Sequence, residues 1–387
     1  MDSSGTTKKY STPVIPANRQ LRANRFARIG RQTSFIKAVL FGAVLIWLAF
    51  GGFSAKITAY LGLPSIQAAM VYALLLIIVY AILSIPFDFY KGFLLARRYG
   101  LSVQGFGGWL AGYLQSALLV STLVIGIVVT AFWSISILPE MWWLLVWAVL
   151  MVVSLVLNLL LPGIIIPRFY RTRPLDDEDL RQRFYALLKK AGVSVKGIYT
   201  IEFSSKQTTA NAALVGIGGG KRILLSDTLL DDYSVEEIEA VISHELGHLK
   251  NRDGAGMLLF QALIIFACLW ITAVSVGALA APLGYSGIGD VALLPLMALV
   301  FAAVNMVFTP VSNAVMRSFE TAADDFAIRL TGNPAAYISM ITKLMRQNLA
   351  EVNPPLWVEF LLYDHPGYYR RISYAGSFMR EKTENSE

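Results

Sequence analysis

SVEEIEAVISHELGHLKNRD, residues 234–253, is the stretch from which the rest of the sequence can be interpreted. Ser234 and Glu237 have the spacing of a capping box at the start of a helix. Apolar residues then recur three and four positions apart, as they do along one face of a helix. The stretch therefore predicts a helix that contains the pentad HELGH, residues 244–248.

His244 and His248 have the spacing needed to bind one metal ion. Positions four apart on a helix share a face and lie about one turn apart, so both imidazoles can reach a single point. Zn²⁺ suits that point, because two histidines and one further protein ligand leave a position for water, whose pKa the metal lowers toward about 7. Glu245 can then accept a proton from that water as it attacks a carbonyl. The pentad predicts metal-assisted hydrolysis of an amide.

Two other interpretations of the pentad are a solvated surface helix and a closed structural zinc site. The sequence has three histidines, and two of them stand at the ligand positions, which argues against the first. A structural site would not need Glu245 and would usually include cysteine. The single cysteine, Cys268, lies within an apolar run and is expected to be apolar filler.

The composition is that of a membrane protein. Of the 387 residues, 56% are hydrophobic and 15% are charged, and the apolar residues are concentrated in long runs. The fold class predicted is mainly α, a polytopic protein with about six transmembrane helices and a cytoplasmic zinc protease domain that contains a small β-sheet. The predicted spans are residues 35–60, 67–95, 109–133, 139–166, 255–283 and 291–315. Pro295, Asn305, Pro310 and Asn313 are expected to interrupt the last span.

The domain organisation follows from these runs. We expect a disordered basic cytoplasmic tail over residues 1–35, a four-helix membrane domain over 36–170, a metalloprotease domain over 171–254, a transmembrane hairpin over 255–316 and the rest of the catalytic domain over 317–387. Residues 171–254 predict a helix that ends at Gly192 and strands within 197–203 and 222–230. The glycine-rich residues 216–220 lack the GK[ST] ending of a phosphate loop and predict a hairpin turn.

Positive charge predicts the orientation. Basic residues gather in the N-terminal tail, at residues 97–98 and at residues 168–173, and such segments face the cytoplasm. Six spans then leave both termini and the pentad on the cytoplasmic side. A nucleic-acid-binding arm is the alternative for the tail, but an apolar span follows at once, which favours contact with anionic lipid and no nucleic-acid partner.

A third zinc ligand is expected where the last span continues into a polar helix. Glu320 stands in the segment MRSFETAADDFAIRL, residues 316–330, and Asp324 lies one turn further on. We predict Glu320 as the ligand and Asp324 as the carboxylate that orients a ligand imidazole. Arg317 could compensate their negative charge. The alternative is a solvated acidic helix face.

Three motifs together resemble a known family. HELGH, ETAADDFA (residues 320–327) and DHPGYYRRI (residues 364–372) are similar to the gluzincin-type membrane zinc metallopeptidases that group type I CAAX prenyl proteases with HtpX-like heat-shock proteases. The resemblance covers residues 86–372. Three further segments favour the CAAX type: IPFDFYKGFLLARRYG (85–100), IIIPRFYRTRPL (164–175) and NAALVG (211–216).

The resemblance implies a role for each matching residue. His244, His248 and Glu320 would bind one Zn²⁺ per chain, Glu245 would be the general base and Asp324 would support a ligand. Asn211 and Ala212 would lie on an edge strand that pairs with an extended substrate. His365 and Arg371 would stabilise an oxyanion or hold a peptide carboxylate, although His365 could also be an ordinary histidine near a helix end.

The sequence also departs from the family pattern. A polar tail stands where CAAX-type members usually have one more transmembrane helix, Ala213 replaces a common aromatic residue, and Gly367 replaces a frequent proline. The leading hypothesis is an integral-membrane zinc endopeptidase in the plasma, inner or endoplasmic reticulum membrane. Its protein or peptide substrates would be prenylated, or they would be misfolded membrane proteins cleaved in quality control. A catalytically silent scaffold is the third alternative, but it would not need Glu245.

Overall fold

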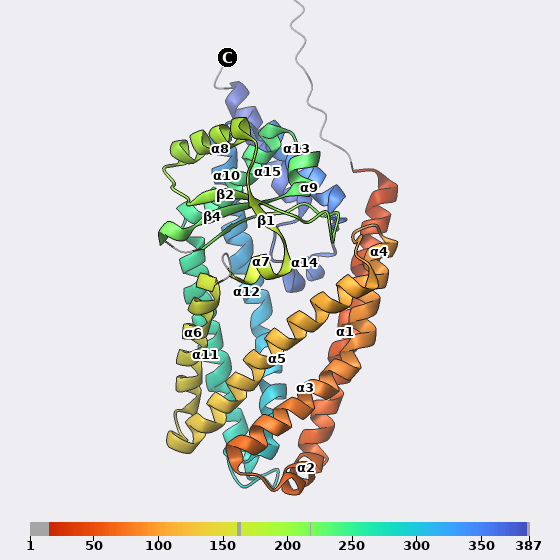
Figure 1. The fold of residues 1–387 in the computed structure, drawn as a ribbon, viewed down its shortest axis with the longest axis vertical. Helices are drawn as coiled ribbons and strands as arrows, with labels where there is room; N and C mark the ends of the chain where they lie inside the picture. Colours follow the sequence, from red (N-terminus) through yellow and green to blue (C-terminus); the bar gives the residue numbers. More distant parts are fainter. Residues whose placement is uncertain (1–14, 161–163, 217, 385–387) are drawn as a thin grey trace, which may run out of the picture. The chain divides into compact units, whose positions relative to one another are not determined.

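The computed structural model describes residues 15–160, 164–216 and 218–384. The chain forms two compact units. One, the polar unit, comprises Met1–Ala27, Tyr170–Asp253 and Ala314–Glu387, and the other, the membrane unit, comprises Arg28–Phe169 and Gly254–Asn313. The expected fold class, mainly α with a small sheet, is confirmed (Figure 1).

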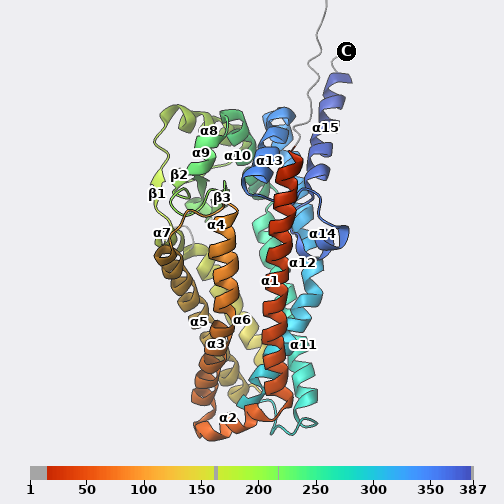
Figure 2. The same ribbon diagram turned by 90° about the vertical axis from the view of Figure 1, so that its right-hand side faces the viewer.

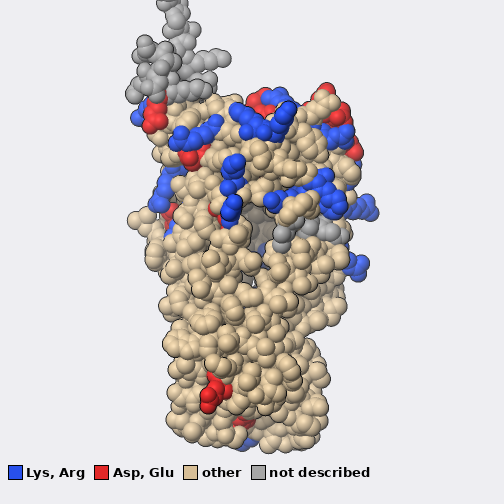
Figure 3. Space-filling view, turned by 90° about the vertical axis from the view of Figure 1, so that its left-hand side faces the viewer, with Lys and Arg blue, Asp and Glu red and all other residues tan. Residues whose placement is uncertain are grey.

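The membrane unit is built from long apolar helices. Among the described residues, six helical stretches are long and apolar enough to cross a membrane: Ala17–Phe50, Ser65–Arg98, Phe106–Ile137, Trp142–Leu160, Asp253–Ala280 and Val291–Thr331. They contain α1 (Ala17–Phe50), α3 (Ser65–Phe89), α5 (Phe106–Ile137), α6 (Trp142–Leu160), α11 (Asp253–Ala280) and α12 (Leu294–Thr331). The short α2 (Phe53–Leu61) follows α1, α4 (Ala96–Arg98) precedes α5, and α7 (Ile166–Phe169) follows α6. A π-helix over Tyr90–Leu95 follows Pro86, which lies inside α3. On the face shown in Figure 3, the surface of these helices is almost entirely uncharged.

A charged pair joins two of the apolar helices of the membrane unit. Lys37 Nζ of α1 lies 2.8 Å from Asp88 Oδ1 of α3. Charged side chains in membrane spans are costly unless they are paired, so this contact favours the neighbouring positions of α1 and α3.

Two predictions about the helices were wrong. The tail was expected to be disordered to residue 35, but α1 begins at Ala17; residues 1–14 lie outside the described part of the chain. Arginine, alanine and leucine are good helix formers, and a helix extends more easily than it nucleates, so the apolar segment continues backward as helix. The last span was expected to be interrupted, but α12 is continuous. Pro295 stands in its first turn, where a backbone N–H has no acceptor within the helix, and Pro310 removes one backbone N–H donor without ending the helix.

The polar unit contains a four-stranded sheet in the order β1-β2-β4-β3. Its strands are β1 (Thr172–Pro174), β2 (Gly197–Ile201), β3 (Ala212–Val215) and β4 (Arg222–Ser226). β1 pairs antiparallel with β2, β2 pairs parallel with β4, and β3 pairs antiparallel with β4. The β3–β4 pairing confirms the predicted hairpin, and β3 is an edge strand.

The polar unit also contains helices α8 (Glu178–Ala191), α9 (Asp227–Asp232), α10 (Val235–Lys250), α13 (Pro334–Gln347), α14 (Leu356–Leu362) and α15 (Tyr368–Glu384). α8 ends, as predicted, at Gly192 in the left-handed conformation. The second predicted strand ends at Ser226, where the short helix α9 begins, because Ser226 caps that helix by accepting a hydrogen bond from the Leu229 amide. Buried side chains from the sheet and helices form one core, which includes Phe184, Ile223, Leu225, Ile242 and Leu246.

Candidate active site

Helix α10 places the pentad in its second half. Ser234 Oγ accepts from the Glu237 amide, and the Glu237 carboxylate accepts from the Ser234 amide at 2.8 Å, so the predicted capping box is confirmed. Glu237 is buried, and it also accepts from Ser339 Oγ and Lys343 Nζ of α13. The start of α10 is therefore fixed both by its own cap and by a neighbouring helix.

Gly247, inside the pentad, allows α10 to contact α12 closely. A Cβ atom at Gly247 would lie 2.8 Å from the Cα atom of Ala323 and 3.1 Å from its carbonyl oxygen. Such distances are too short for a side chain, so glycine is needed at this crossing. Because Glu320 lies one turn before Ala323, the close approach brings its carboxylate to the two histidines.

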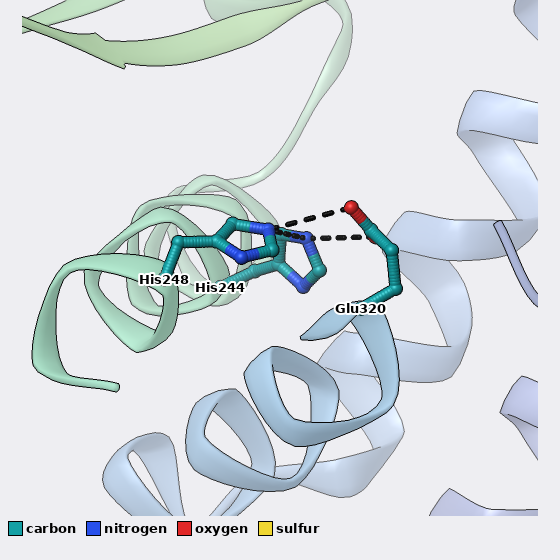
Figure 4. Close-up of side chains that lie close together, drawn as sticks. All are labelled: His244, His248 and Glu320. Carbon is teal, nitrogen blue, oxygen red and sulfur yellow. Dashed lines mark hydrogen bonds and ion pairs between the residues drawn. The ribbon is translucent and has the colours of Figure 1, made fainter. Parts of the chain in front are cut away.

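Three side chains that could bind a metal, two from α10 and one from α12, converge, as Figure 4 shows. His244 Nε2 lies 3.2 Å from His248 Nε2. Glu320 Oε2 lies 3.3 Å from His244 Nε2, and Glu320 Oε1 lies 3.4 Å from His248 Nε2. The structure thus brings together the three side chains that the sequence predicted as ligands.

The arrangement of these atoms fits a metal ion. The ligand atoms of His244, His248 and Glu320 all lie within 4.8 Å of one another. Glu320 Oε2 is buried and has no hydrogen-bond donor among the described residues, and an unsatisfied buried carboxylate oxygen is costly unless a cation compensates it. Two imidazoles and a carboxylate are also a donor set that zinc takes in catalytic sites.

A carboxylate lies beside the other nitrogen of each imidazole. His244 Nδ1 lies 2.9 Å from Asp324 Oδ1, and His248 Nδ1 lies 2.9 Å from Asp253 Oδ2. A proton held at Nδ1 leaves Nε2 as the atom that can bind a metal. Burial alone would lower the pKa of His244, but the contacts with Asp324 and Glu320 outweigh it and raise that pKa to about 9.

Asp253 was missed in the sequence analysis. Arg252, directly before it, has a φ of 60°, in the left-handed region, and forms a turn after the end of α10. This turn returns Asp253 to His248. The signal was an acidic residue five positions after the second histidine, but its contact depends on a backbone conformation that arginine seldom adopts.

Arg371 contacts Asp324. Its Nε lies 2.8 Å from Asp324 Oδ2, its Nη2 lies 2.5 Å from Asp324 Oδ1, and its Nε also donates to Tyr337 Oη at 3.2 Å. Burial lowers the pKa of the guanidinium, yet the carboxylate of Asp324 outweighs it and holds that pKa far above its usual range. The guanidinium group of Arg371 is thus paired with Asp324, whereas an oxyanion or a substrate carboxylate had been predicted as its partner.

The carboxylate of Glu245, the residue after the first ligand histidine, contacts β3. Its Oε2 accepts from the Leu214 amide at 3.2 Å. Removal from water raises the pKa of the Glu245 carboxyl, and the charges of His244 and His248 offset part of this effect. A carboxylate with a raised pKa is better suited to taking up and releasing a proton near neutral pH.

The two predicted substrate-binding residues lie at the start of the edge strand. Ala212 begins β3, and Asn211 directly precedes it. The Asn211 amide donates to Ser226 Oγ, and its carbonyl accepts from the Ser226 amide, both at 3.0 Å. Residues alternate in direction along a strand, so Ala212 and Leu214 direct their amides away from β4, and the Leu214 amide reaches Glu245.

His365 lies between α14 and α15, close to the ligand group. Its Nε2 is 3.3 Å from Glu320 Oε1, and its Nδ1 is 2.8 Å from Asp364 Oδ1. The side chain is 54% exposed, unlike those of His244 and Glu320, at 12% and 6%. The contact with Asp364 raises the pKa of His365 despite the opposing effect of burial. A protonated imidazole is a suitable donor to a developing negative charge.

Two family models match the chain. The model of peptidase family M48 matches residues 174–377, and the model described as "CAAX prenyl protease N-terminal, five membrane helices" matches residues 15–171. The described part of the second range contains four helices long and apolar enough to span a membrane.

Individual proteins are similar over most of their length. The uncharacterized metalloprotease YhfN of Bacillus subtilis is 29% identical over 92% of this chain and 86% of its own. The human CAAX prenyl protease 1 homolog is 25% identical over 84% of this chain and 79% of its own. The crystal structure of S. mikatae Ste24p has a TM-score of 0.82 and 21% sequence identity, covering 95% of this chain and 92% of that one.

Proposed function

We infer the reaction of this protein from its family. The chain belongs to peptidase family M48 and is a zinc metalloprotease, a hydrolase that acts on peptide bonds. It is a multi-pass membrane protein whose fold is that of Ste24p. We propose that it is an endopeptidase that holds one Zn²⁺ per chain on His244, His248 and Glu320. The convergence of these three side chains, two of them on the helix that also carries Glu245, is the observation that supports the proposal.

Each residue around the metal has a part in the proposed reaction. When bound, zinc supplies the Lewis acidity that polarises a carbonyl and lowers the pKa of water. Glu245 takes the proton of the attacking water and later delivers it to the leaving amine. His365 donates to the charge that develops on the carbonyl oxygen. Asp324 and Asp253 hold the two ligand imidazoles in the orientation that presents Nε2.

The edge strand β3 is proposed to position the substrate. Ala212 and Leu214 direct backbone groups away from β4, and an extended peptide could add there as a further strand. The bond to be cleaved would then lie beside Glu245, because Glu245 already contacts the amide of Leu214. Asn211 fixes the start of this strand through Ser226.

The substrate class is proposed from the relatives. Several similar proteins are named CAAX prenyl protease 1 or a homolog of it, and we propose processing of prenylated proteins near their C-terminus. Cleavage of misfolded membrane proteins in quality control is the alternative. The distribution of basic residues supports a cytoplasmic catalytic unit and cytoplasmic termini. A reporter after Glu387 should then be cytoplasmic and one at Ser286 external; the reverse pattern would refute this orientation.

The test of the proposed function replaces Glu245 with glutamine. Glu245→Gln keeps the size of the side chain and leaves the three ligands in place, but it cannot accept a proton. Cleavage should fall about 10²- to 10⁴-fold with zinc content unchanged. Glu236→Gln is the matched control, because Glu236 lies on the same helix with a side chain 48% exposed, and it should cleave like wild type.

The slow variant also identifies the substrate. Proteins retained by Glu245→Gln, identified by mass spectrometry, should share a lipidated C-terminus if the enzyme processes prenylated proteins. A heterogeneous set of membrane proteins would favour quality control instead. Wild-type cleavage rates in Glu245→Gln would refute the proposed general base.

A further inference from the structure

The short helix α14 exposes nearly all of its apolar side chains. Its sequence is LWVEFLL, residues 356–362. Leu356 is 80% exposed, Trp357 62%, Phe360 56% and Leu362 50%. Val358 alone among its hydrophobic residues is buried, and it attaches the helix to the polar unit.

This exposure is unusual within the polar unit. Among the described residues of that unit, nine large hydrophobic side chains are exposed, and five of the nine lie in α14: Leu356, Trp357, Phe360, Leu361 and Leu362. Two more, Tyr369 and Tyr374, lie on the following helix α15. Scattered apolar residues are normal on a protein surface, but a contiguous group marks a surface that is covered in use.

The helix carries one charge, and that charge is turned inward. The side chain of Glu359 is 13% exposed. Its Oε1 accepts from the Gly367 amide at 3.3 Å and lies 3.6 Å from Arg370 Nη2. The outer surface of α14 is therefore uncharged, and it contains the leucine and aromatic side chains typical of a helix lying in a membrane interface.

Arg317 connects α14 to the end of a membrane-spanning helix. Its Nη1 donates to the carbonyls of Glu359 at 3.1 Å and Tyr363 at 2.6 Å, and Figure 2 shows α14 beside α12. Arg317 is the first charged residue after the apolar run of α12. α14 is thus bonded to the helix that also carries an apolar run, at the residue where that helix becomes polar.

We propose that α14 lies in the headgroup layer of the bilayer, with Leu356, Trp357 and Phe360 inserted among the lipids. The contact would hold the loop that carries His365, three residues after α14, at a fixed depth beside the membrane. A lipid surface is favoured over a protein partner because the patch is uncharged and small, and because Arg317, which bonds to α14, directly follows the apolar run of α12 in the sequence. The proposal concerns where the helix lies and does not depend on the proposed peptidase activity.

The test measures the depth of a label on α14 in the full-length protein. Trp357→Cys and, independently, Leu356→Cys are labelled with an environment-sensitive fluorophore and reconstituted into nanodiscs of phosphatidylcholine with a minor share of phosphatidylglycerol. Nitroxide lipids, labelled either near the headgroup or near the acyl end, and aqueous iodide serve as quenchers. Tyr185→Cys on α8, exposed in the polar unit, is the aqueous control, and Met306→Cys is the lipid control. The wild-type chain, whose single cysteine is buried, measures background labelling.

The proposal expects both α14 labels to be quenched at least about twofold more by the headgroup nitroxide than by the acyl-end nitroxide, and to be protected from iodide relative to the Tyr185 label. The Met306 label should respond more strongly to the acyl-end nitroxide. Iodide quenching equal to that at Tyr185 would overturn the proposal. Protection from both lipid nitroxides and iodide would also overturn it, because it would show that a protein, such as a substrate or a second copy of this chain, covers α14.

Discussion

The two sides of the candidate active site differ in how firmly they are fixed. On the metal side, His244, His248 and Glu320 are largely buried, and Asp324 and Asp253 lie against the imidazoles. On the substrate side, His365 is half exposed, and β3 is an edge strand of the sheet that the described residues form. The metal side is a set of buried charges that need one another, whereas the substrate side is more open to a partner.

This difference suggests a division of roles. The geometry of a metal site must be held closely, because a small displacement of a ligand weakens the metal's effect. A surface that accepts extended peptides can use backbone groups, which any sequence supplies. Damage to the metal side should therefore reduce stability and metal binding, and damage to the substrate side should reduce turnover alone.

The largest effect on stability is expected for Arg371→Met. It leaves the buried carboxylate of Asp324 without its cation, and breaking a buried ion pair in this way costs about 3–5 kcal/mol. Thermal unfolding in detergent should show the loss. Arg370→Met is the matched control, since its side chain is 68% exposed, and it should change stability little. If Arg371 instead holds a substrate carboxylate, Arg371→Met would be as stable as wild type and would have a raised KM.

The next effect is expected for His365→Phe, on the substrate side. Loss of a donor to the oxyanion should lower kcat about 10²- to 10³-fold, because the ring keeps its approximate size but can no longer donate. Zinc content, measured on the same samples, should stay at the wild-type level. Loss of zinc in His365→Phe would place His365 on the metal side and contradict the division proposed here.

A smaller effect separates two neighbouring carboxylates on α12. Asp324→Asn weakens the support of His244, and zinc affinity should fall about 10- to 100-fold. Asp325→Asn, one position along, should leave zinc affinity unchanged, because Asp325 pairs with Arg329. Competition with a chelator measures both. Equal affinities in the two variants would show that Asp324 does not orient the ligand.

The sequence predicted those parts of the site that depend on the spacing of neighbouring residues along a helix. The capping box at Ser234 and Glu237 fixes the start of α10, and the four-residue interval between His244 and His248 follows from the helix period. The same period brought Glu320 and Asp324 to one face of α12. These features could be recognised because each depends on residues within about one turn of each other.

Contacts between residues far apart in the sequence could not be predicted from the spacing of motifs. The pairing of Arg371 with Asp324 joins residues 47 positions apart, whereas the family resemblance implied an oxyanion or a peptide carboxylate as the partner of Arg371. Asp253 reaches His248 only because Arg252 adopts an unusual conformation. A disordered tail was expected to residue 35, but α1 begins at Ala17, because arginine is a good helix former and the apolar segment that follows is helical.

The central claim is that His244, His248 and Glu320 together bind one zinc ion, and metal analysis of Glu320→Gln tests it most directly. Wild-type protein purified after zinc reconstitution should carry about one zinc per chain. Glu320→Gln, which keeps the shape of the side chain but removes its charge, should carry far less, while Asp325→Asn on the same helix should match wild type. Full zinc occupancy in a folded Glu320→Gln variant, or no zinc in the wild-type protein, would contradict the account.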